Sequence, residues 1–379
     1  MNIIFACGGT GGHIYPAVAM YEEFVRNDLG SMHKYLFVGS DYGLEKDIFP
    51  AENIAGYKLI KSRGIKRSLS PSNFKSVWCN IAAFSQARKI VRDFQPDMVI
   101  GTGGYPSFHI TNRAAKQKIP FFLIEGNARP GIVVKLYHKK ATRVFAATGT
   151  IRQHLKTDAN LRITGLPSRG AGVCRSKSEI LRDLGFAQFA QHGDGKVVVI
   201  FGGSCGSPAL NAAASGYVEQ PRPDRLVIWA TGKANYAQVM NDITDVPINV
   251  KIVDYINNMR EILSVADIIV SRAGAMTIQE IKDFKLPAVL VPFGAAAGNH
   301  QYINASELAA LGTAKIIKES EITSGILRSA IDDVLSNGET IREIYDKFPA
   351  SGNVSEAIYK EIAACMGGLA KDYYSQATR

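Results

Sequence analysis

Four glycine-rich turns are the parts of this 379-residue chain whose residue types and spacing best suit phosphate binding. Each follows a short apolar run and precedes a segment with helical periodicity, so backbone N–H groups and the positive end of a helix dipole can face one anion. A single turn of this kind is as often used only to pack a helix on a strand, so by itself it is neutral evidence. Four in one chain favour phosphate chemistry. The turns are Gly8-Gly9-Thr10-Gly11-Gly12, Thr102-Gly103-Gly104, Gly202-Gly203-Ser204-Cys205-Gly206 and Arg272-Ala273-Gly274.

Three side chains near these turns carry groups suited to transfer chemistry. His13 follows the first turn at the start of a helix, where an imidazole can act as a general base or bind a substrate; the alternative is a polar helix cap. Glu280 lies in the first turns of the helix after Gly274, where a carboxylate can accept two ribose hydroxyls or merely complement the helix dipole. Arg169 follows a Gly-x-Pro turn, where it can hold a diphosphate or lie solvated on the surface.

The better-known nucleotide and metal motifs are not matched. The dinucleotide pattern Gly-x-Gly-x-x-Gly has Ile14 at its third glycine, and Asp41 lies about 30 residues on instead of about 20. There is no Gly-x-x-x-x-Gly-Lys-Ser/Thr of a P-loop and no Asp-x-Asp. The five cysteines form no Cys-x-x-Cys pair, which argues against a zinc cluster or a disulfide framework. We therefore expect neither a metal nor a cofactor.

The elements that must position these residues alternate between strand and helix. Apolar runs at 2–7, 97–101, 196–201 and 267–270 predict strands, each entering a glycine turn, and 16–25 and 276–281 predict helices after two of them. This alternation implies parallel sheets. The length suits two domains, and the weakly patterned stretch 158–191 is the best place for a linker.

We therefore predict an α/β protein of two Rossmann-like domains, residues 1–167 and 168–354, with a C-terminal helix at 355–379 packing back on the first. Ligands of open α/β sheets gather at the carboxyl ends of the strands. Two sheets facing across a cleft would bring all four turns to one site, which suits a transfer between two substrates.

The charge of +10 favours an anionic partner, whether a nucleotide diphosphate, a nucleic acid or a membrane surface. Residues 56–95 hold nine Lys or Arg and one acidic residue, Asp93. No apolar run is long enough to cross a bilayer, and the N-terminus is typical of a first strand rather than of a signal peptide, which favours the cytoplasm.

An apolar stripe at helical spacing lies within this basic segment: Phe74, Val77, Trp78, Ile81 and Phe84. It is either the buried face of a surface helix or, together with basic residues such as Lys61, Arg63, Lys66, Arg67 and Lys75, a contact with a membrane surface.

On these motifs the chain resembles the MurG family of glycosyltransferases over nearly its whole length. Gly8–Ala17 resembles the first signature loop of the family and Gly101–Tyr105 the second, and Gly202–Gly206 with Asn211 is similar to its donor phosphate loop. The most specific likeness, to the UDP-sugar signature, runs through Ser271–Glu280, Leu286–Phe293 and Asn299–Ala305.

The resemblance implies a GT-B fold in which the N-terminal domain binds the acceptor and the C-terminal domain binds UDP-N-acetylglucosamine. By matching positions, Thr10, Gly11 and Gly12 would meet the junction of donor and acceptor, and Asn127 would touch the sugar. Arg169 and Ser204 would hold the diphosphate, and the Ile256 backbone would contact uracil. Ala275, Met276, Thr277, Ile278, Gln279 and Glu280 would wrap the nucleotide, with Glu280 on the ribose, and Gln301 would lie near the sugar hydroxyls.

The implied reaction is the inverting transfer of N-acetylglucosamine from UDP to the 4-hydroxyl of N-acetylmuramic acid on lipid I, giving lipid II for peptidoglycan. His13 is the candidate base and Glu125 the next. The partners would be UDP-N-acetylglucosamine, lipid I and an anionic membrane surface, at the cytoplasmic face of the inner membrane, with no nucleic acid. Two alternatives remain open: a related transferase with a diacylglycerol-type acceptor, and an inactive protein that binds nucleotide sugars.

The chain departs from the family pattern mainly on the acceptor side. Ile124-Glu125-Gly126-Asn127 replaces His-Glu-Gln-Asn, and Ser107-Phe108-His109 replaces Ser-Gly-Pro. Leu166 stands where the linker usually has Asn, and Cys205 where the donor loop usually has Gln. These changes concern the acceptor and the rate of catalysis more than the donor nucleotide.

Overall fold

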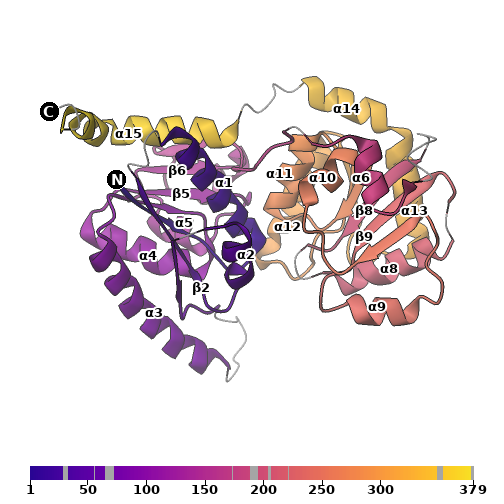
Figure 1. The fold of residues 1–379 in the computed structure, drawn as a ribbon, viewed down its shortest axis with the longest axis horizontal. Coiled ribbons are helices and arrows are strands. Elements are labelled where there is room, and N and C mark those ends of the chain that lie inside the picture. Colours follow the sequence, from indigo (N-terminus) through magenta and orange to yellow (C-terminus); the bar gives the residue numbers. More distant parts are fainter. Residues whose placement is uncertain are drawn as a thin grey trace. The chain divides into compact units, whose positions relative to one another are not determined.

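The chain forms two compact units, Met1–Ser168 with Gly352–Arg379, and Arg169–Ser351. We call them the first and the second unit (Figure 1). The computed structural model describes residues 1–28, 33–54, 56–64, 72–172, 174–187, 195–203, 206–220, 222–347 and 353–376.

The first unit is built on a seven-stranded sheet in the order β3-β2-β1-β4-β5-β6-β7, in which every neighbouring pair is parallel. Its central strands are buried along nearly their whole length, because helices cover both faces of a parallel sheet. The strands are β1 Asn2–Ala6, β2 Lys34–Ser40, β3 Tyr57–Ile60, β4 Met98–Gly101, β5 Phe121–Glu125, β6 Arg143–Ala146 and β7 Leu161–Ile163.

The helices of the first unit fill the crossovers between these strands. Figure 1 shows α3 running beside α4, and α15, near the C-terminus, running beside α1. Phe24 of α1 meets Tyr359 of α15 edge to face at 5.0 Å, and Glu361 accepts hydrogen bonds from Arg143 at 2.9 Å and Arg162 at 3.2 Å. The helices are α1 Gly11–Asn27, α2 Glu45–Ala51, α3 Ser72–Phe94, α4 Gly104–Gln117, α5 Ile132–Tyr137, the 3₁₀ helix η1 Gly149–His154, and α15 Val354–Gln376.

The second unit repeats the plan with a six-stranded parallel sheet in the order β10-β9-β8-β11-β12-β13. Its strands are β8 Lys196–Phe201, β9 Arg225–Ala230, β10 Val250–Val253, β11 Ile268–Ser271, β12 Ala288–Leu290 and β13 Ala314–Ile316. Its helices are α6 Lys177–Asp183, α8 Pro208–Val218, α9 Tyr236–Asp242, α10 Met259–Val265, α11 Ala275–Phe284, η2 Ala297–Asn299, α12 His300–Ala310, α13 Ser324–Ser336 and α14 Gly338–Lys347.

The strand order explains why the four glycine turns lie where a ligand can bind. In each sheet the chain builds outward on one side of the first strand and then returns to build on the other, so β1 lies beside β4 and β8 lies beside β11. These are the four strands that the glycine turns follow. Such a reversal of strand order opens a crevice at the carboxyl ends of the two strands, where α/β proteins bind ligands.

Two parallel-sheet α/β domains were predicted from the sequence, and the sheets confirm them. One helix differs, because α1 begins at Gly11 and not near Pro16. Pro16 lies in its second turn and has no N–H to donate to the Gly12 carbonyl, so the helix forgoes one hydrogen bond there. His13 therefore belongs to the first helical turn. Among the described residues, none of the helices combines the length and apolar character needed to cross a membrane.

Candidate functional site

The first glycine turn fixes the orientation of the His13 ring. Gly8 and Gly9 have φ of 154° and 90°, which let the chain turn sharply from β1 into α1. The His13 Nδ1 lies 3.2 Å from the Gly8 carbonyl oxygen and 3.4 Å from the Thr10 hydroxyl. Because a carbonyl only accepts, the bond to Gly8 places the ring proton on Nδ1. Nε2 is then the nitrogen with the lone pair, which is the form a general base requires.

The second turn lies directly against the first. A Cβ on Gly104 would fall 2.1 Å from the Gly8 carbonyl oxygen, and one on Gly103 would fall 2.6 Å from Cδ2 of His13. The Thr102 hydroxyl donates to the His13 carbonyl at 2.5 Å. Only glycine at 103 and 104 permits this approach, so the two turns and the imidazole form one cluster at the carboxyl ends of β1 and β4.

Glu125 is placed where it holds a loop. It ends β5, is buried, and accepts from the Asn127 N–H at 3.0 Å, the Asn127 Nδ2 at 3.1 Å and the Gly131 N–H at 2.6 Å. Three hydrogen bonds to one carboxylate orient Asn127 and the turn to α5. This geometry favours a supporting part for Glu125 over that of a base.

His109, which departs from the family pattern, has a packing role in the structure. His109 is buried in α4, its Nε2 donates to Oδ1 of Asn80 on α3 at 3.0 Å, and its ring meets Phe84 edge to face at 4.5 Å. Burial lowers the pKa of His109 to about 4, so the ring is neutral at ordinary pH. In this chain the residue ties α3 to α4.

On the second unit, the turn after β8 is equally tight. A Cβ on Gly206 would lie 2.4 Å from the Thr231 carbonyl oxygen, and Ser207 caps α8 by accepting from the Leu210 N–H at 3.3 Å. Asn211 is buried, donating to the Thr231 carbonyl at 2.9 Å and accepting from the Trp229 indole at 3.2 Å. Ser204, predicted to hold the diphosphate, lies outside the described residues, as does Cys205.

A partly buried ion pair joins this turn to its neighbour after β11. Arg272 is 8% exposed, donates to the Ser207 hydroxyl at 2.8 Å and pairs with Glu319. Glu319 also accepts from the Gly294 N–H at 2.9 Å. Burial alone would raise the pKa of Glu319, but the bonds from Arg272 and Gly294 outweigh it, and the pKa is lowered. Nothing in the sequence predicts this pair, because its two residues lie 47 positions apart.

The N-terminus of α11 presents backbone groups. The helix begins after Gly274 without a side-chain cap, so the N–H groups around Ala275, Met276 and Thr277 are those that a helix normally leaves for an anion. Ile278 and Gln279 are buried, so these two of the predicted nucleotide contacts direct their side chains into the unit.

Glu280 on α11 is largely buried, and only part of its surface is exposed to solvent. Burial, with a smaller contribution from the charge of Asp283, raises its pKa to about 8. A carboxyl with so high a pKa is typical of functional sites.

The other predicted donor contacts lie at different places in the second unit. Ile256 is buried in the turn after β10, while Arg169 is exposed at the first residue of the unit. Gln301 on α12 accepts from the Phe293 N–H at 2.9 Å through Oε1, which leaves its amide nitrogen as the donor for a ligand.

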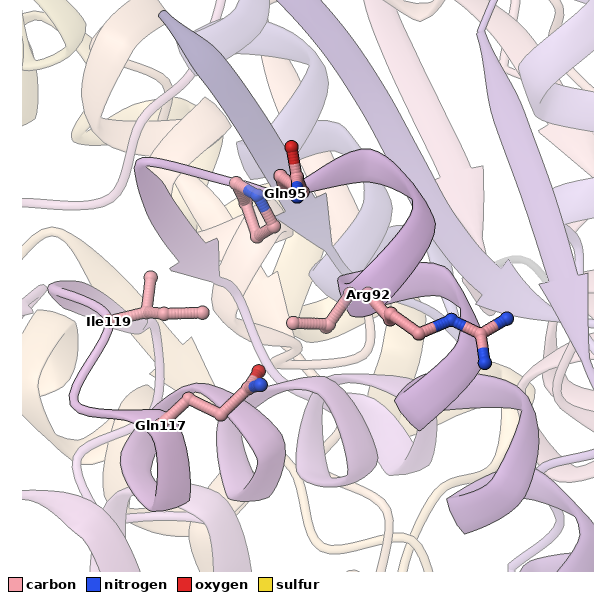
Figure 2. A pocket seen from close by; sticks show the side chains of 6 residues that line it. Arg92, Gln95, Gln117 and Ile119 are labelled. Atoms are coloured by element: carbon pink, nitrogen blue, oxygen red, sulfur yellow. The ribbon is translucent and has the colours of Figure 1, made fainter.

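A pocket on the first unit lies away from these turns. Its lining residues, Val91, Arg92, Gln95, Pro96, Gln117 and Ile119, precede β4 and β5 and therefore mark the amino ends of the strands (Figure 2). The two glycine turns of this unit lie at the opposite edge of its sheet. In the part of the chain that the structure describes, no three His, Cys, Asp or Glu side chains are grouped to hold a metal ion.

Comparison with known proteins assigns each unit to a family model. The glycosyltransferase family 28 N-terminal domain matches residues 3–146 and the family 28 C-terminal domain matches residues 197–358.

Named relatives cover nearly the whole chain. A UDP-N-acetylglucosamine–N-acetylmuramyl-(pentapeptide) pyrophosphoryl-undecaprenol N-acetylglucosamine transferase of Desulforamulus reducens is 37% identical over 91% of this chain and 92% of its own. The Bacillus subtilis protein of the same name is 34% identical over 93% and 95%. The crystal structure of Acinetobacter baumannii MurG matches with a TM-score of 0.66 at 24% identity, covering 95% of this chain and 99% of that one, which shows a shared fold.

Proposed function

The chain belongs to the family 28 glycosyltransferases that act as N-acetylglucosamine transferases on pyrophosphoryl-undecaprenol N-acetylmuramyl-pentapeptide, and we propose how its residues carry out that transfer. It moves N-acetylglucosamine from UDP to the muramyl sugar of lipid I and so forms lipid II of peptidoglycan. The fold is the GT-B fold of its family.

On the acceptor side, His13 is the base. The 4-hydroxyl oxygen of the muramyl sugar forms the new bond to C1 of N-acetylglucosamine, the bond from C1 to the UDP oxygen breaks, and the hydroxyl proton passes to Nε2 of His13. The observation that carries this assignment is the bond from Nδ1 to the Gly8 carbonyl, because it sets the tautomer. A base in position is worth roughly 10²- to 10⁴-fold in rate.

On the donor side, the second unit holds UDP-N-acetylglucosamine. The N-terminus of α11 and the turn before α8 offer backbone N–H groups to the diphosphate, whose negative charge grows as it leaves. Arg169 and Ser204 add to that charge stabilisation. Glu280 accepts the ribose hydroxyls, the backbone at Ile256 contacts uracil, and Gln301 donates to the sugar.

Helix α3 is the proposed membrane contact. Val77, Trp78, Ile81 and Phe84 are 46%, 74%, 56% and 41% exposed, so they are not the buried face of a surface helix. Exposed basic residues Arg88, Lys89 and Arg92 follow on the same helix. Lys66 and Arg67 lie outside the described residues, as do the side chains of Phe74 and Lys75.

A second exposed pair extends the apolar surface of the first unit. Ile132 and Leu136 on α5 are 54% and 56% exposed, with exposed Lys135 between them, and α5 packs on α4, which packs on α3. Each basic residue near an anionic surface contributes about 1 kcal/mol, and insertion of an apolar side chain adds a similar amount. Together they would hold the protein at the leaflet that carries lipid I, the cytoplasmic face of the membrane.

Radiolabelled UDP-N-acetylglucosamine with a lipid I analogue tests the chemistry. We expect a disaccharide product whose new linkage is β, because in-line attack inverts the α configuration of the donor. A parallel reaction with diacylglycerol should give no product. Retention of configuration would contradict direct attack, and donor binding without transfer would identify an inactive relative.

Sedimentation with anionic vesicles tests the membrane contact. Ile81→Ser should weaken binding severalfold, and binding of the parent should fall as salt rises. Ile248→Ser, the same change at a 72% exposed site on the second unit, is the matched control. Equal vesicle binding by both variants would contradict the assignment of α3.

A further inference from the structure

A buried carboxylate lies beneath the first glycine turn. Glu45 is the first residue of α2 and is completely buried. Its Oε1 accepts from the Gly9 N–H at 2.9 Å and from the Ser40 N–H at 2.7 Å, so it joins the turn after β1 to the end of β2. Nothing in the proposed mechanism uses this residue.

Three glycines make room for this side chain. A Cβ on Gly8 would lie 2.0 Å from Oε1 of Glu45, one on Gly43 would lie 1.8 Å from Oε2, and one on Gly39 would lie 2.6 Å from Cγ. These distances are far below van der Waals contact, and two of the three clashes are with the carboxylate oxygens themselves. The backbone of the turn after β1, and that of the end of β2 with the loop after it, are therefore shaped around one carboxylate.

The structure pairs Glu45 with no cation among the residues it describes. No ion pair within the described ranges involves Glu45, and its Oε2 is buried without a hydrogen-bond partner. Burial raises the pKa of the neighbouring Cys7 thiol, and the negative charge of Glu45 raises it further. The field of the carboxylate thus acts on the start of the turn.

The peptide bond between Gly8 and Gly9 connects Glu45 to His13. Its N–H donates to Oε1 of Glu45, and its carbonyl accepts from Nδ1 of His13 at 3.2 Å. A negative acceptor on the N–H polarises the peptide and makes its carbonyl a stronger acceptor, because linked hydrogen bonds reinforce one another. The same two bonds prevent the peptide plane from rotating.

We propose that Glu45 is a positioning residue that acts through the Gly8–Gly9 peptide to hold His13 in the tautomer with the lone pair on Nε2 and to strengthen that nitrogen as a base. This inference rests on the proposed function, in which His13 takes the acceptor proton. The arrangement does for His13 what a carboxylate bonded directly to a catalytic imidazole does elsewhere, with one peptide group between them.

Steady-state kinetics of Glu45→Gln test the proposal, since the amide keeps the shape and an oxygen acceptor but removes the charge. We expect kcat to fall roughly ten- to a hundredfold, within the range attributable to a general base, while KM for UDP-N-acetylglucosamine stays within about twofold. Asp47→Asn, which removes a charge from an exposed position of the same helix, should leave both constants unchanged. An unchanged kcat in Glu45→Gln would overturn the proposal.

The His13→Ala background separates positioning from a general structural effect. If Glu45 acts through His13, adding Glu45→Gln to His13→Ala should change kcat by less than about twofold. The same fold-loss in both backgrounds would show that Glu45 only supports the fold and would overturn the inference.

Nitrogen NMR of the protein labelled at histidine measures the tautomer of His13 directly and does not depend on activity. We expect His13 to carry its proton on Nδ1, and in Glu45→Gln a larger share on Nε2. A proton on Nε2 in the parent overturns the inference. If instead the parent has this tautomer but transfers no sugar to lipid I analogue, the proposed function fails while the hydrogen-bonded chain from Glu45 to His13 stands.

Discussion

Glu280→Gln should have opposite effects on stability and on donor binding. The pKa of Glu280 is raised from its ordinary value of 4.5 to about 8, by burial first and by Asp283 second. The folded protein therefore holds this proton more tightly than the unfolded chain does. Stability of the parent is then full below about pH 4.5 and falls as pH rises towards 8.

The difference between the two pKa values sets a ceiling of about 5 kcal/mol on the stability lost above pH 8. Because Glu280 is partly exposed, we expect about 1 to 3 kcal/mol, which corresponds to roughly 2 to 10 °C in melting temperature for a unit of this size. A neutral glutamine does not titrate. Glu280→Gln should therefore match the parent at pH 5 and melt at a higher temperature at pH 9.

Binding of UDP should change in the other direction. Hydrogen bonds to a charged acceptor are worth about 1.5 to 3 kcal/mol, so loss of the carboxylate should weaken UDP binding roughly ten- to a hundredfold at pH 9. In the parent, the affinity for UDP should decrease as pH falls below about 8, because the carboxyl must lose its proton to accept both ribose hydroxyls. In Glu280→Gln this part of the pH dependence should disappear.

Scanning calorimetry at pH 5, 7 and 9, with and without UDP, measures both effects. Glu339→Gln, the same change at an exposed position of α14, should alter neither. A stability difference between Glu280→Gln and the parent that is equal at pH 5 and pH 9 would refute the reasoning from burial. An unchanged dissociation constant for UDP would remove Glu280 from the ribose site.

Three further outcomes are expected. His13→Ala should lower kcat by roughly 10²- to 10⁴-fold and leave the UDP dissociation constant nearly unchanged, as kinetics and calorimetry can measure; full activity would point to another base. Glu319→Gln should destabilise the protein by about 1.5 to 3 kcal/mol, because it removes the charge that pairs with the buried Arg272; a melting temperature like that of the parent would contradict this. Transfer activity should survive excess EDTA, and a strict need for magnesium would show that the charge of the leaving diphosphate is balanced by a cation.

Much of the donor and acceptor machinery is readable from contiguous residues. The turns after β1, β4, β8 and β11 are each a short apolar run, a few glycines and a helix, so local propensity is enough to recognise them. The alternation of such units also predicted the parallel sheets, because a right-handed crossover is the usual way to join parallel strands. The start of α1 at Gly11 was missed, since Pro16 and the glycines weaken the helical pattern there.

Other features of the protein could be recognised only from the tertiary structure. The stripe Val77, Trp78, Ile81 and Phe84 has helical spacing whether it is buried or exposed, and only the packing of α3 on α4 shows that it faces outward. Glu45 and Gly9 are 36 residues apart, and Arg272 and Glu319 are 47 apart.

The sequence by itself determined the local pieces of this protein: the glycine turns, the histidine beside the first of them, the strand and helix alternation, and through these its family. The tertiary structure alone decided which buried carboxylate supports which turn. The physical reason is that backbone propensity acts over a few neighbouring residues, whereas the partner of a buried charge is set by the strand order that brings distant segments together.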